Sequence, residues 1–422
     1  MKQGLGLFVL KWLRFWARLQ LKKYAPDIIG ITGSAGKTSG RNAVKAILQD
    51  KYQLKVSYKA NSESGIPLNI LGIKPKDFSC LDWLRMMVLA PIKLLTNWQP
   101  YEILVVEMGV DSPQAPKNME YLLTIVRPRT AIYLNALPVH TAYYADSDPV
   151  AAIATEKGKL IESLPENGLA ILNRDDPRVW GFKAKTKAQV MSFGKNPGSD
   201  VVITSWRPEI KGTTFGFRAE ETRAELSLPD LLPEHLGSTL AAALCVALDE
   251  DYSLPEGVEL LAKNYRLPPG RATLLLGLNG SMILDSSYNA SPQTMADMLA
   301  LLAQVKAKRK LVLLGDMREL GAAGPEAHTE VIKLALTAAA KVFLVGPLMR
   351  QAMVAGAVWC TNANQAAEVI EPQLKSGDLL MVKGSQNTIL LETAVEKLLA
   401  KAADKVKLCR RGPYWERQRA RL

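Results

Sequence analysis

The sequence contains few of the residues that build metal-bound or cross-linked small domains. Its 422 residues include only four cysteines and three histidines. The cysteines lie far apart and form no CxxC pair, which argues against a zinc ribbon or a disulfide framework and fits a reducing cytoplasm. No internal repeat or low-complexity segment is apparent. What remains is an ordinary globular composition, 48% hydrophobic, in a chain long enough for two or three domains.

A long uninterrupted apolar run is also missing. Residues 5–21 are rich in Leu, Phe and Trp. Cations recur among them at three- and four-residue steps, at Lys11, Arg14, Arg18 and Lys22. This pattern predicts a basic amphipathic helix over residues 1–26, and it matches neither a signal peptide nor a spanning helix. Two interpretations stay open: residues 5–23 contact an acidic membrane surface, or the helix packs on the following domain through its Trp and Leu face.

One other segment, Leu81–Leu95, is apolar with few charges. It is too short to span a membrane, and Pro91 is expected to interrupt any helix through it. The segment is interpreted either as a buried or partner-facing helix or as a second membrane-contact surface.

The chain carries a formal charge of +12, which favours anionic partners. Nucleic acid is not expected among them, because the basic residues are concentrated at both ends and no reading module accompanies them. The strongly basic tail, residues 405–422, is interpreted as a solvated end.

From Asp27 onward, short apolar runs alternate with helical patterns, which predicts an α/β fold with a mostly parallel sheet. The expected strands are Ile28–Thr32, Ile103–Glu107, Ala131–Leu134, Leu169–Leu172, Met282–Asp285, Leu311–Leu314, Val342–Val345 and Leu379–Val382. Residues 264–271 (NYRLPPGR) carry a turn signal and mark the expected domain boundary. The segment Val201–Pro229 alternates as an antiparallel insertion would.

The sequence IIGITGSAGKTSG places an apolar strand before Gly30, Gly33 and Gly36, then Lys37 and Thr38 and a helical pattern. Such a loop cradles phosphates: backbone N–H groups and the helix N-terminus face the anion, the lysine neutralises charge and the threonine hydroxyl ligates Mg²⁺. Ile31 stands where the strict pattern has glycine, so the loop is a variant. The expected nucleotide contacts are Gly33, Ser34, Ala35, Gly36, Lys37, Thr38 and Ser39.

Polar residues follow other predicted strands. Glu107 ends the strand EILVVE at the edge where open α/β sheets bind ligands, and a carboxylate there can hold Mg²⁺. His140 also follows a strand, although a lone histidine is more often a hydrogen-bonded structural residue. Lys157 lies within a helical pattern, and spacing alone gives it no role.

Three strand ends in the last third of the chain are also polar. ILDSSYNASPQTM contains Asp285, Tyr288 and Asn289; LVLLGDMRELG contains Asp316; LLMVKGSQN contains Lys383 and Ser385. Three polar strand ends on one sheet edge favour a binding site over three independent turns.

Together these residues resemble the Mur ligase family from about Asp27 to Ala400. The markers are ITGSAGKTS, NSESGIPL from Asn61, VVEMG, His140, EKGKL around Lys157, PPGR ending at Arg271, DSSYNASPQTM, LGDMRELG with His328, and VKGS. The forms SYNASP and GDMRELG resemble the branch that adds D-alanyl-D-alanine. The resemblance implies a P-loop central domain over residues 27–268 and a Rossmann-like C-terminal domain over residues 269–404.

The resemblance also implies the chemistry. ATP would phosphorylate the carboxylate of UDP-MurNAc-tripeptide, and the amine of D-Ala-D-Ala would attack the acyl phosphate. Lys37, Lys157 and His140 would be catalytic; Thr38, Glu107, His140 and a carbamylated Lys157 would hold Mg²⁺. Nucleotide contacts from the C-terminal part would be Arg271, Tyr288 and Asn289, with Arg271 at a hinge. Substrate contacts would be Asn61, Asp316, Lys383 and Ser385.

This chain departs from the family pattern in three places. Only 29 residues precede Gly30, where the family has a domain that grips UDP, so that domain is expected to be missing. The HN..N pattern reads His235 to Thr239 without asparagine, and KGE reads KGK from Lys157. Two alternatives are a related ligase with another amino-acid acceptor, of polyglutamate or cyanophycin type, and a non-catalytic scaffold on a membrane surface.

Overall fold

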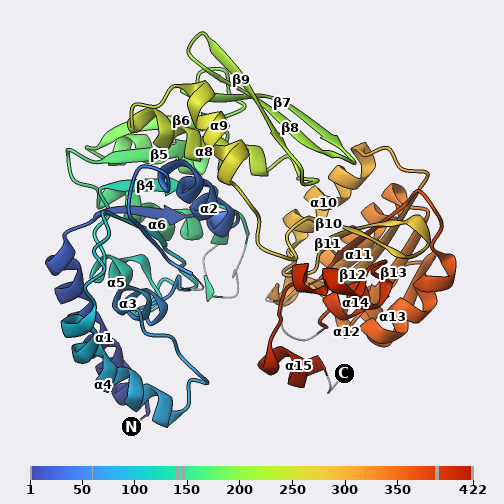
Figure 1. The fold of residues 1–422 in the computed structure, drawn as a ribbon, viewed down its shortest axis with the longest axis horizontal. Helices are drawn as coiled ribbons and strands as arrows, with labels where there is room; N and C mark the ends of the chain where they lie inside the picture. Colours follow the sequence, from blue (N-terminus) through green and yellow to red (C-terminus); the bar gives the residue numbers. More distant parts are fainter. Residues whose placement is uncertain are drawn as a thin grey trace. The chain divides into compact units, whose positions relative to one another are not determined.

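The computed structural model describes residues 2–58, 60–138, 143–144, 148–318, 320–384 and 389–419. The chain forms two compact units. The first consists of Met1–Thr204, Gly216–Ala224 and Ser238–Tyr265, and the second of Ser205–Phe215, Glu225–Gly237 and Arg266–Leu422. Each unit contains helices and strands (Figure 1).

A nine-stranded sheet organises the first part of the chain. Its strand order is β2 (Leu54–Val56), β3 (Ile103–Glu107), β1 (Asp27–Thr32), β4 (Thr130–Tyr133), β5 (Leu169–Asn173), β6 (Gln189–Gly194), β7 (Val201–Glu209), β8 (Gly212–Ala219) and β9 (Thr222–Leu228). Neighbouring strands from β2 to β7 are parallel. Two-residue connections join β7, β8 and β9, and connections this short join antiparallel neighbours.

Helices cover the parallel strands, whose buried residues alternate between the two faces. They are α2 (Lys37–Leu48), α3 (Gly65–Leu71), α5 (Met119–Leu123), α6 (Pro149–Glu162), α7 (Pro177–Trp180), α8 (Leu236–Asp249) and α9 (Leu254–Asn264), with the 3₁₀ helix η2 (Gly181–Lys185). Ile28, Leu104 and Tyr133 belong to one hydrophobic core that also contains residues of α3, α5 and α6. Helix starts are locally encoded: the Asp148 side chain caps α6, and Ser253 and Glu256 form a capping box on α9.

The second unit is built on a six-stranded sheet with its own core. The strand order is β10 (Thr273–Leu276), β11 (Met282–Ser286), β15 (Asp378–Lys383), β12 (Arg309–Gly315), β13 (Lys341–Val345) and β14 (Ala357–Cys360). All pairs are parallel except β10 with β11. The helices are α10 (Pro292–Gln304), α11 (Gly324–Ala338), α12 (Pro347–Gln351), α13 (Ala363–Ile370), α14 (Glu392–Leu398) and α15 (Pro413–Arg419). Short 3₁₀ turns are η3 (Leu278–Gly280), η4 (Gly321–Ala323), η5 (Glu371–Gln373) and η6 (Ala402–Lys407).

The predicted fold class is confirmed, and each of the eight expected strands is present within one or two residues of its expected bounds. The expected antiparallel segment over 201–229 is the β7–β9 meander. Strands β2, β6, β10 and β14 were missed. Strand β6 lies inside the sheet, but its first three residues are not buried. The other three are three or four residues long and lie at a sheet edge. Edge strands are buried less completely, so their sequences carry a weaker apolar pattern.

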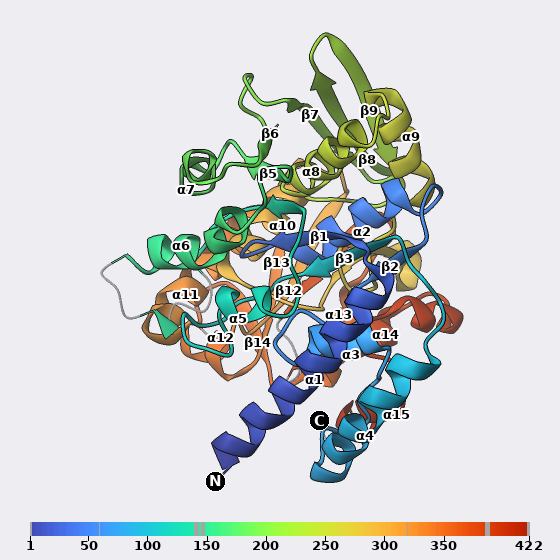
Figure 2. The ribbon, with the colours of Figure 1, turned by 90° about the vertical axis from the view of Figure 1, so that its left-hand side faces the viewer.

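Helices α1 (Lys2–Tyr24) and α4 (Cys80–Thr96) run along the first unit in the same direction (Figures 1 and 2). Leu13 and Ala17 of α1 are fully buried in the first unit's core. Near its end, Lys23 donates to the carbonyls of Leu94 and Asn97 at 3.2 and 3.0 Å. The interpretation of α1 as a packed helix is therefore confirmed for this face, while Lys11, Arg18 and Lys22 stay exposed.

The expected interruption at Pro91 is wrong, because α4 continues through it. Proline lacks the N–H that would bond the carbonyl four residues earlier, which is that of Met87. The indole Nε1–H of Trp12 donates to the Met87 oxygen at 3.1 Å. A side chain of α1 thus satisfies the carbonyl that Pro91 leaves open, and this pairing helps the helix to continue.

None of the helices in the described part of the chain combines the length and the apolar character needed to cross a membrane.

We expect Trp12→Phe to lower the free energy of unfolding of the first unit by about 1 kcal/mol or more, because it removes this hydrogen bond. The same substitution in a Pro91→Ala background should cost less, since an alanine in place of the proline supplies the missing N–H. Urea denaturation of the four proteins measures the coupling. Equal effects of Trp12→Phe in both backgrounds would show that the indole contributes only packing.

Candidate active site

The predicted phosphate loop connects β1 to α2, as the motif requires. Gly36 caps α2 with φ 84°, in the left-handed region that glycine adopts without strain. A Cβ at Gly36 would lie 3.2 Å from Thr239 Oγ1. Thr239, which stands where the family pattern has asparagine, is therefore packed against the loop. The glycine is required both by conformation and by close approach.

The loop is held by residues that follow β4, which sequence reasoning missed. The Asn135 side chain accepts from Ala35 N at 2.8 Å and donates to Ala35 O at 3.2 Å. Ser34 Oγ donates to Leu137 O at 3.0 Å and accepts from Leu137 N at 2.9 Å. The parallel pairing of β1 with β4 is the signal that could have located them, since it brings both strand ends to one edge.

The ammonium of Lys37 lies over the loop. Its Nζ donates to Gly33 O at 2.5 Å and to Ser34 O at 3.4 Å. Carbonyl groups thus hold the cation beside the loop and the α2 N-terminus, where backbone N–H groups favour an anion. The arrangement suits the β- and γ-phosphates of a nucleotide.

Thr38 and Glu107 meet as predicted. Thr38 Oγ1 donates to Glu107 Oε2 at 3.1 Å, and Arg41 Nη1 lies 2.7 Å from Glu107 Oε1. Both members of this ion pair are almost fully buried. A hydroxyl and a carboxylate oxygen at one point are ligands that suit Mg²⁺. Arg41, which the sequence did not single out, holds the carboxylate from the other side.

Lys157 is 2% exposed, contrary to the solvated position usual for a helix lysine. Its Nζ donates to Val110 O at 3.3 Å, three residues beyond Glu107. Burial, followed by the charge of Lys37, lowers the pKa of Lys157 to about 7, against the opposing effect of Asp111 and Glu156. At pH values above this, Lys157 is a neutral and therefore nucleophilic amine.

Lys159, where the family pattern has glutamate, pairs with Glu156 at 2.7 Å and Glu120 at 3.1 Å. Its charge is thereby compensated close to Lys157. Among the described residues, no group of three or more His, Cys, Asp or Glu side chains forms a metal site. His140 lies outside the described residues. Of the metal ligands implied by the resemblance, Thr38 and Glu107 are therefore seen in contact with each other.

Asn61 lies against the same strand end. Its carbonyl accepts from Gly109 N at 2.9 Å, and a Cβ on Gly109 would be 3.1 Å from Asn61 Nδ2. Any larger residue at this position would have to displace Asn61 by a few tenths of an ångström. The segment NSESGIPL is thus fixed beside VVEMG.

In the second unit, Lys383 ends β15 and is almost fully buried. Its Nζ donates to Asn289 O at 2.9 Å and to Ser286 Oγ at 3.4 Å. Burial, then the charge of Arg271, lowers the pKa of Lys383 to about 7. Burial also raises the pKa of Asp285, which underlies the same loop. Two of the three polar strand ends are therefore joined by hydrogen bonds, and the third follows β12, which pairs with β15.

Arg271 and Tyr288 also come together, with the guanidinium carbon 4.7 Å from the ring centroid. On the same ring, Arg410 lies 5.3 Å from the centroid. Arg410 donates to the carbonyls of Ser287 and Tyr288. The loop that presents Tyr288 and Asn289 is thereby tied to the end of the chain.

The interpretation of residues 405–422 as a solvated end is wrong for Leu408, Cys409 and Arg410, which are buried. Arg410 Nη1 lies 2.7 Å from Glu392 Oε2, and both side chains are at most 2% exposed. The basic composition of this segment suggested that it is exposed to solvent, but Arg410 neutralises the buried carboxylate of Glu392. The residues beyond 419 lie outside the described part.

The third strand end is arranged around Asp316, whose Oδ1 accepts from Met349 N at 2.8 Å. Burial raises the pKa of Asp316. His328 Nε2 accepts from Met317 N at 2.9 Å and its Nδ1 bonds to Gly324 O at 2.6 Å, so this histidine positions the loop. Ser385 lies outside the described residues.

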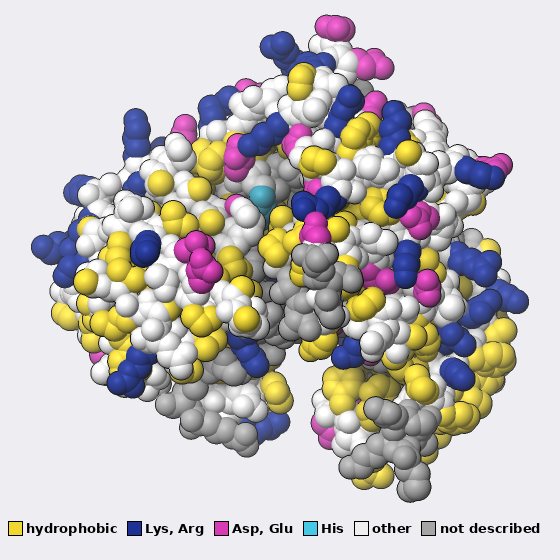
Figure 3. All heavy atoms as spheres, turned by 180° about the vertical axis from the view of Figure 1, so that it is seen from behind, with side chains coloured by type: hydrophobic (Ala, Val, Ile, Leu, Met, Phe, Trp, Pro, Cys, Tyr) yellow, Lys and Arg dark blue, Asp and Glu magenta, His cyan; other side chains and the backbone are white. Residues whose placement is uncertain are grey.

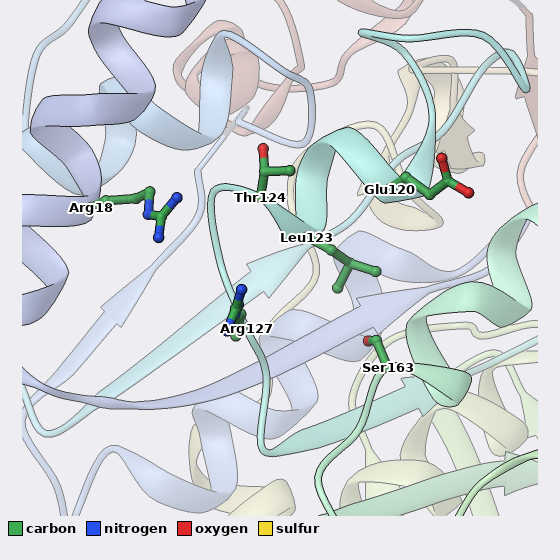
Figure 4. A pocket seen from close by; sticks show the side chains of 6 residues that line it. All are labelled: Arg18, Glu120, Leu123, Thr124, Arg127 and Ser163. Carbon is green, nitrogen blue, oxygen red and sulfur yellow. The ribbon is translucent and has the colours of Figure 1, made fainter.

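A pocket of about 410 Å³ lies elsewhere on the first unit (Figure 4). It is lined by Arg18, Glu120, Leu123, Thr124, Arg127 and Ser163. Arg127 and Ser163 precede β4 and β5, so the pocket lies at the amino ends of these strands. The phosphate loop and Glu107 follow their strands and lie at the opposite edge.

The sequence matches two family descriptions: the Mur ligase middle domain over residues 31–247 and the Mur ligase glutamate ligase domain over residues 270–386. It is 26% identical over 388 residues to the UDP-N-acetylmuramoyl-tripeptide--D-alanyl-D-alanine ligase of Escherichia coli, covering 90% of this chain and 78% of that protein. The fold is similar to that of MurF ligase from Thermotoga maritima in complex with ADP, with a TM-score of 0.78, 22% identity, and 94% and 84% of the two chains covered. MurF from Acinetobacter baumannii gives 0.77 and 21%, covering 93% and 81%.

We expect Arg410→Met to destabilise the second unit by about 3 kcal/mol at pH 8, because it removes the nearer of the two arginines that pair with buried Glu392, the other being Arg419 at 3.8 Å. Burial raises the pKa of Glu392, so loss of the arginine costs more as the pH rises above the ordinary carboxyl value. Denaturation at pH 5 should show a smaller loss than at pH 8.

The neighbouring Arg411→Met is the matched control, since Arg411 forms a partly exposed pair with Glu396 that contributes at most about 1 kcal/mol. A second substitution, Glu392→Met, should restore much of the stability lost in Arg410→Met. Equal losses in the two arginine variants would contradict the role of the buried pair.

Proposed function

The chain belongs to the Mur ligase family, and we propose that it is an ATP-dependent ligase that joins UDP-MurNAc-tripeptide to D-Ala-D-Ala. The similar proteins of Escherichia coli and Treponema pallidum carry the name of this activity. The observation that carries the chemistry is the convergence of the phosphate loop, the Thr38–Glu107 pair and buried Lys157 in one unit. Phosphate-binding, cation-binding and nucleophilic groups together suit phosphoryl transfer to a carboxylate.

The reaction has two steps. The substrate carboxylate attacks the γ-phosphorus of ATP, giving an acyl phosphate and ADP. The amine of D-Ala-D-Ala then attacks the carbonyl carbon and loses one proton to solvent, and the tetrahedral intermediate expels phosphate with the electrons of the C–O bond. The loop N–H groups and Lys37 hold the transferring phosphate and offset its charge, which is where most of the barrier lowering is expected.

Mg²⁺ is the proposed cation, with Thr38, Glu107, His140 and the carbamate of Lys157 as its ligands. When bound, it neutralises charge on the nucleotide phosphates. The hydrogen bond between Thr38 and Glu107 supports this set, because it places two hard oxygen ligands together. Arg41 forms an ion pair with the buried Glu107 carboxylate and holds it in place.

A carbamate on Lys157 is proposed because this lysine, as a cation, would repel Mg²⁺. The neutral amine adds to the carbon of CO₂ and loses one proton, which converts the side chain into an anionic oxygen ligand. The lowered pKa of Lys157 supports the modification, since only the uncharged amine attacks CO₂. Burial then shields the product from water.

For the second unit we propose that Arg271, Tyr288 and Asn289 contact the nucleotide. Asn61, Asp316, Lys383 and Ser385 are the proposed substrate contacts, and residues 27–268 and 269–404 the proposed central and C-terminal domains. The convergence of Lys383 with the Asn289 carbonyl supports the grouping. A ligase with a different acceptor is not favoured, because the similar curated proteins are D-alanyl-D-alanine-adding enzymes.

The proposed location is the cytoplasm, with residues 5–23 in contact with the inner face of the membrane. The exposed cations Lys11, Arg18 and Lys22 support this contact. Because α1 is packed on the first unit, the contact would be made by its outward face alone.

We expect the purified protein to release phosphate from ATP only when both UDP-MurNAc-tripeptide and D-Ala-D-Ala are present, and to form the amide product seen by mass spectrometry. Lys37→Ala should lower turnover at least a hundredfold, since it removes charge from the phosphate site. A panel of other amino-acid and dipeptide acceptors serves as control. Product with another acceptor, and none with D-Ala-D-Ala, would overturn the substrate assignment.

We expect a ¹³C-carbamate signal when the protein is equilibrated with ¹³C-bicarbonate. The signal should be strong above pH 7 and should fall as the pH drops through about 7, where Lys157 becomes protonated. Lys157→Arg should abolish it, while Lys159→Arg should not. A signal that persists in Lys157→Arg would place the modification elsewhere.

A further inference from the structure

Helix α4 presents an apolar stripe to solvent. Only Asp82, Met86 and Ala90 of α4 are buried. The exposed large apolar side chains recur at helical spacing and are Leu81, Leu84, Val88, Ile92 and Leu95. Leu81 and Leu95 are 79% and 70% exposed, so the stripe extends for roughly 21 Å along the helix. Isolated exposed leucines need no explanation, but a continuous row of five does.

Aromatic side chains extend the stripe at both ends. Phe78 precedes α4 and Trp98 follows it, at 55% and 74% exposure. On α1, Phe8 and Phe15 are also more than half exposed. An exposed Trp at the margin of an apolar strip is typical of surfaces that enter the headgroup region of a bilayer, and the phenylalanines add apolar area beside it.

Cations accompany the stripe on the adjoining helix. Residues 2–24 contain six Lys or Arg and no Asp or Glu, and Lys11, Arg18, Lys22 and Lys23 are exposed. Arg127 adds a further charge beside Arg18 in the pocket of Figure 4. Figure 3 shows hydrophobic side chains with Lys and Arg side chains beside them in the area where α1 and α4 lie.

The one acidic side chain of α4 is neutralised within the protein. Asp82 accepts hydrogen bonds from the backbone N–H groups of residues 76–78 and pairs with Arg85 at 2.6 Å. Hydrogen bonds of this kind hold the pKa of Asp82 well below its usual range. The outward charge of the two helices is therefore positive.

We propose that the face formed by the α4 stripe and the cations of α1, the α1–α4 face, binds the surface of a bilayer that contains anionic lipid. This inference rests on the membrane contact proposed above and moves its apolar part from α1 to α4. A second copy of the chain is the less suitable occupant, since two such faces would bring like charges together. An anionic bilayer complements both the apolar row and the cations.

The test is co-flotation of the full-length protein with vesicles of phosphatidylcholine, alone or with phosphatidylglycerol. We expect flotation with phosphatidylglycerol vesicles and little with phosphatidylcholine. Leu84→Ser with Leu95→Ser should abolish it, and Lys11→Glu with Lys22→Glu should weaken it roughly thirtyfold or more. Each changed side chain is exposed, so folding should be retained.

Matched controls come from exposed residues of the second unit. Val406→Ser replaces a side chain that is 74% exposed, and Lys306→Glu with Lys333→Glu repeats the charge change; neither should alter flotation. Absence of flotation with either vesicle, or equal flotation with both, would overturn the proposal. The proposal would also be overturned if the unaltered protein formed a dimer, the variant with Leu84→Ser and Leu95→Ser did not, and neither of the two bound vesicles.

Ligase turnover with soluble substrates, measured without vesicles, should be unchanged in all of these variants. A variant that binds no vesicles but keeps its turnover therefore separates the membrane contact from the ligase assignment. Turnover that is absent from every protein, together with intact flotation, would instead contradict the ligase assignment alone.

Discussion

The parallel pairing of β1 with both β3 and β4 is the constraint on which the candidate site depends. Ile31 pairs with Glu107 and Thr32 with Tyr133, so the segments that follow these strands emerge at one edge of the sheet. The phosphate loop follows β1, Glu107 ends β3, and Asn135 follows β4. Residues about a hundred positions apart thus meet because the strands that carry them pair, and no specific contact between these residues is needed to bring them together. Each strand needs only its own buried apolar residues to take its place.

Each of the two units buries charged side chains, a paired carboxylate and a lysine in each case. In the first, Glu107 is balanced by Arg41, whereas Lys157 donates to the carbonyl of Val110 and has a lowered pKa. In the second, Glu392 is balanced by Arg410, whereas Lys383 is similarly depressed in pKa. Paired charges fix backbone segments, while burial lowers the pKa of the two lysines. Burial of an amine costs stability. A buried lysine at each of the two strand-end clusters therefore indicates a functional role for these lysines more than a role in packing.

The sequence predicts most of the fold because the central strands other than β6 are largely buried and form continuous apolar runs. It also predicts the phosphate loop, because the positive φ angles at Gly33 and Gly36 admit few residues other than glycine. It does not reveal the role of Arg410, whose buried position depends on a carboxylate 18 residues away, nor the contact of Asn135 with Ala35, which needs the strand order. Lys157 was named through resemblance and not through spacing, because only tertiary packing makes it buried. The expected interruption at Pro91 was wrong for the same reason. The Met87 carbonyl, which Pro91 leaves without an N–H donor, is satisfied by Trp12 of α1, far away in the sequence.

The hydrogen bond between Trp12 and the Met87 carbonyl has a consequence for the chain as it leaves the ribosome. Helix α1 is made before α3 and α4, and its Leu and Trp face has no cover until these two helices have followed it. Helix α4, for its part, contains a carbonyl that it cannot satisfy alone. Neither helix is complete as a local element, so this corner of the protein must assemble by a contact across the chain and not by sequential helix formation. In the interval, the nascent chain presents a basic, apolar segment to whatever surface is nearest.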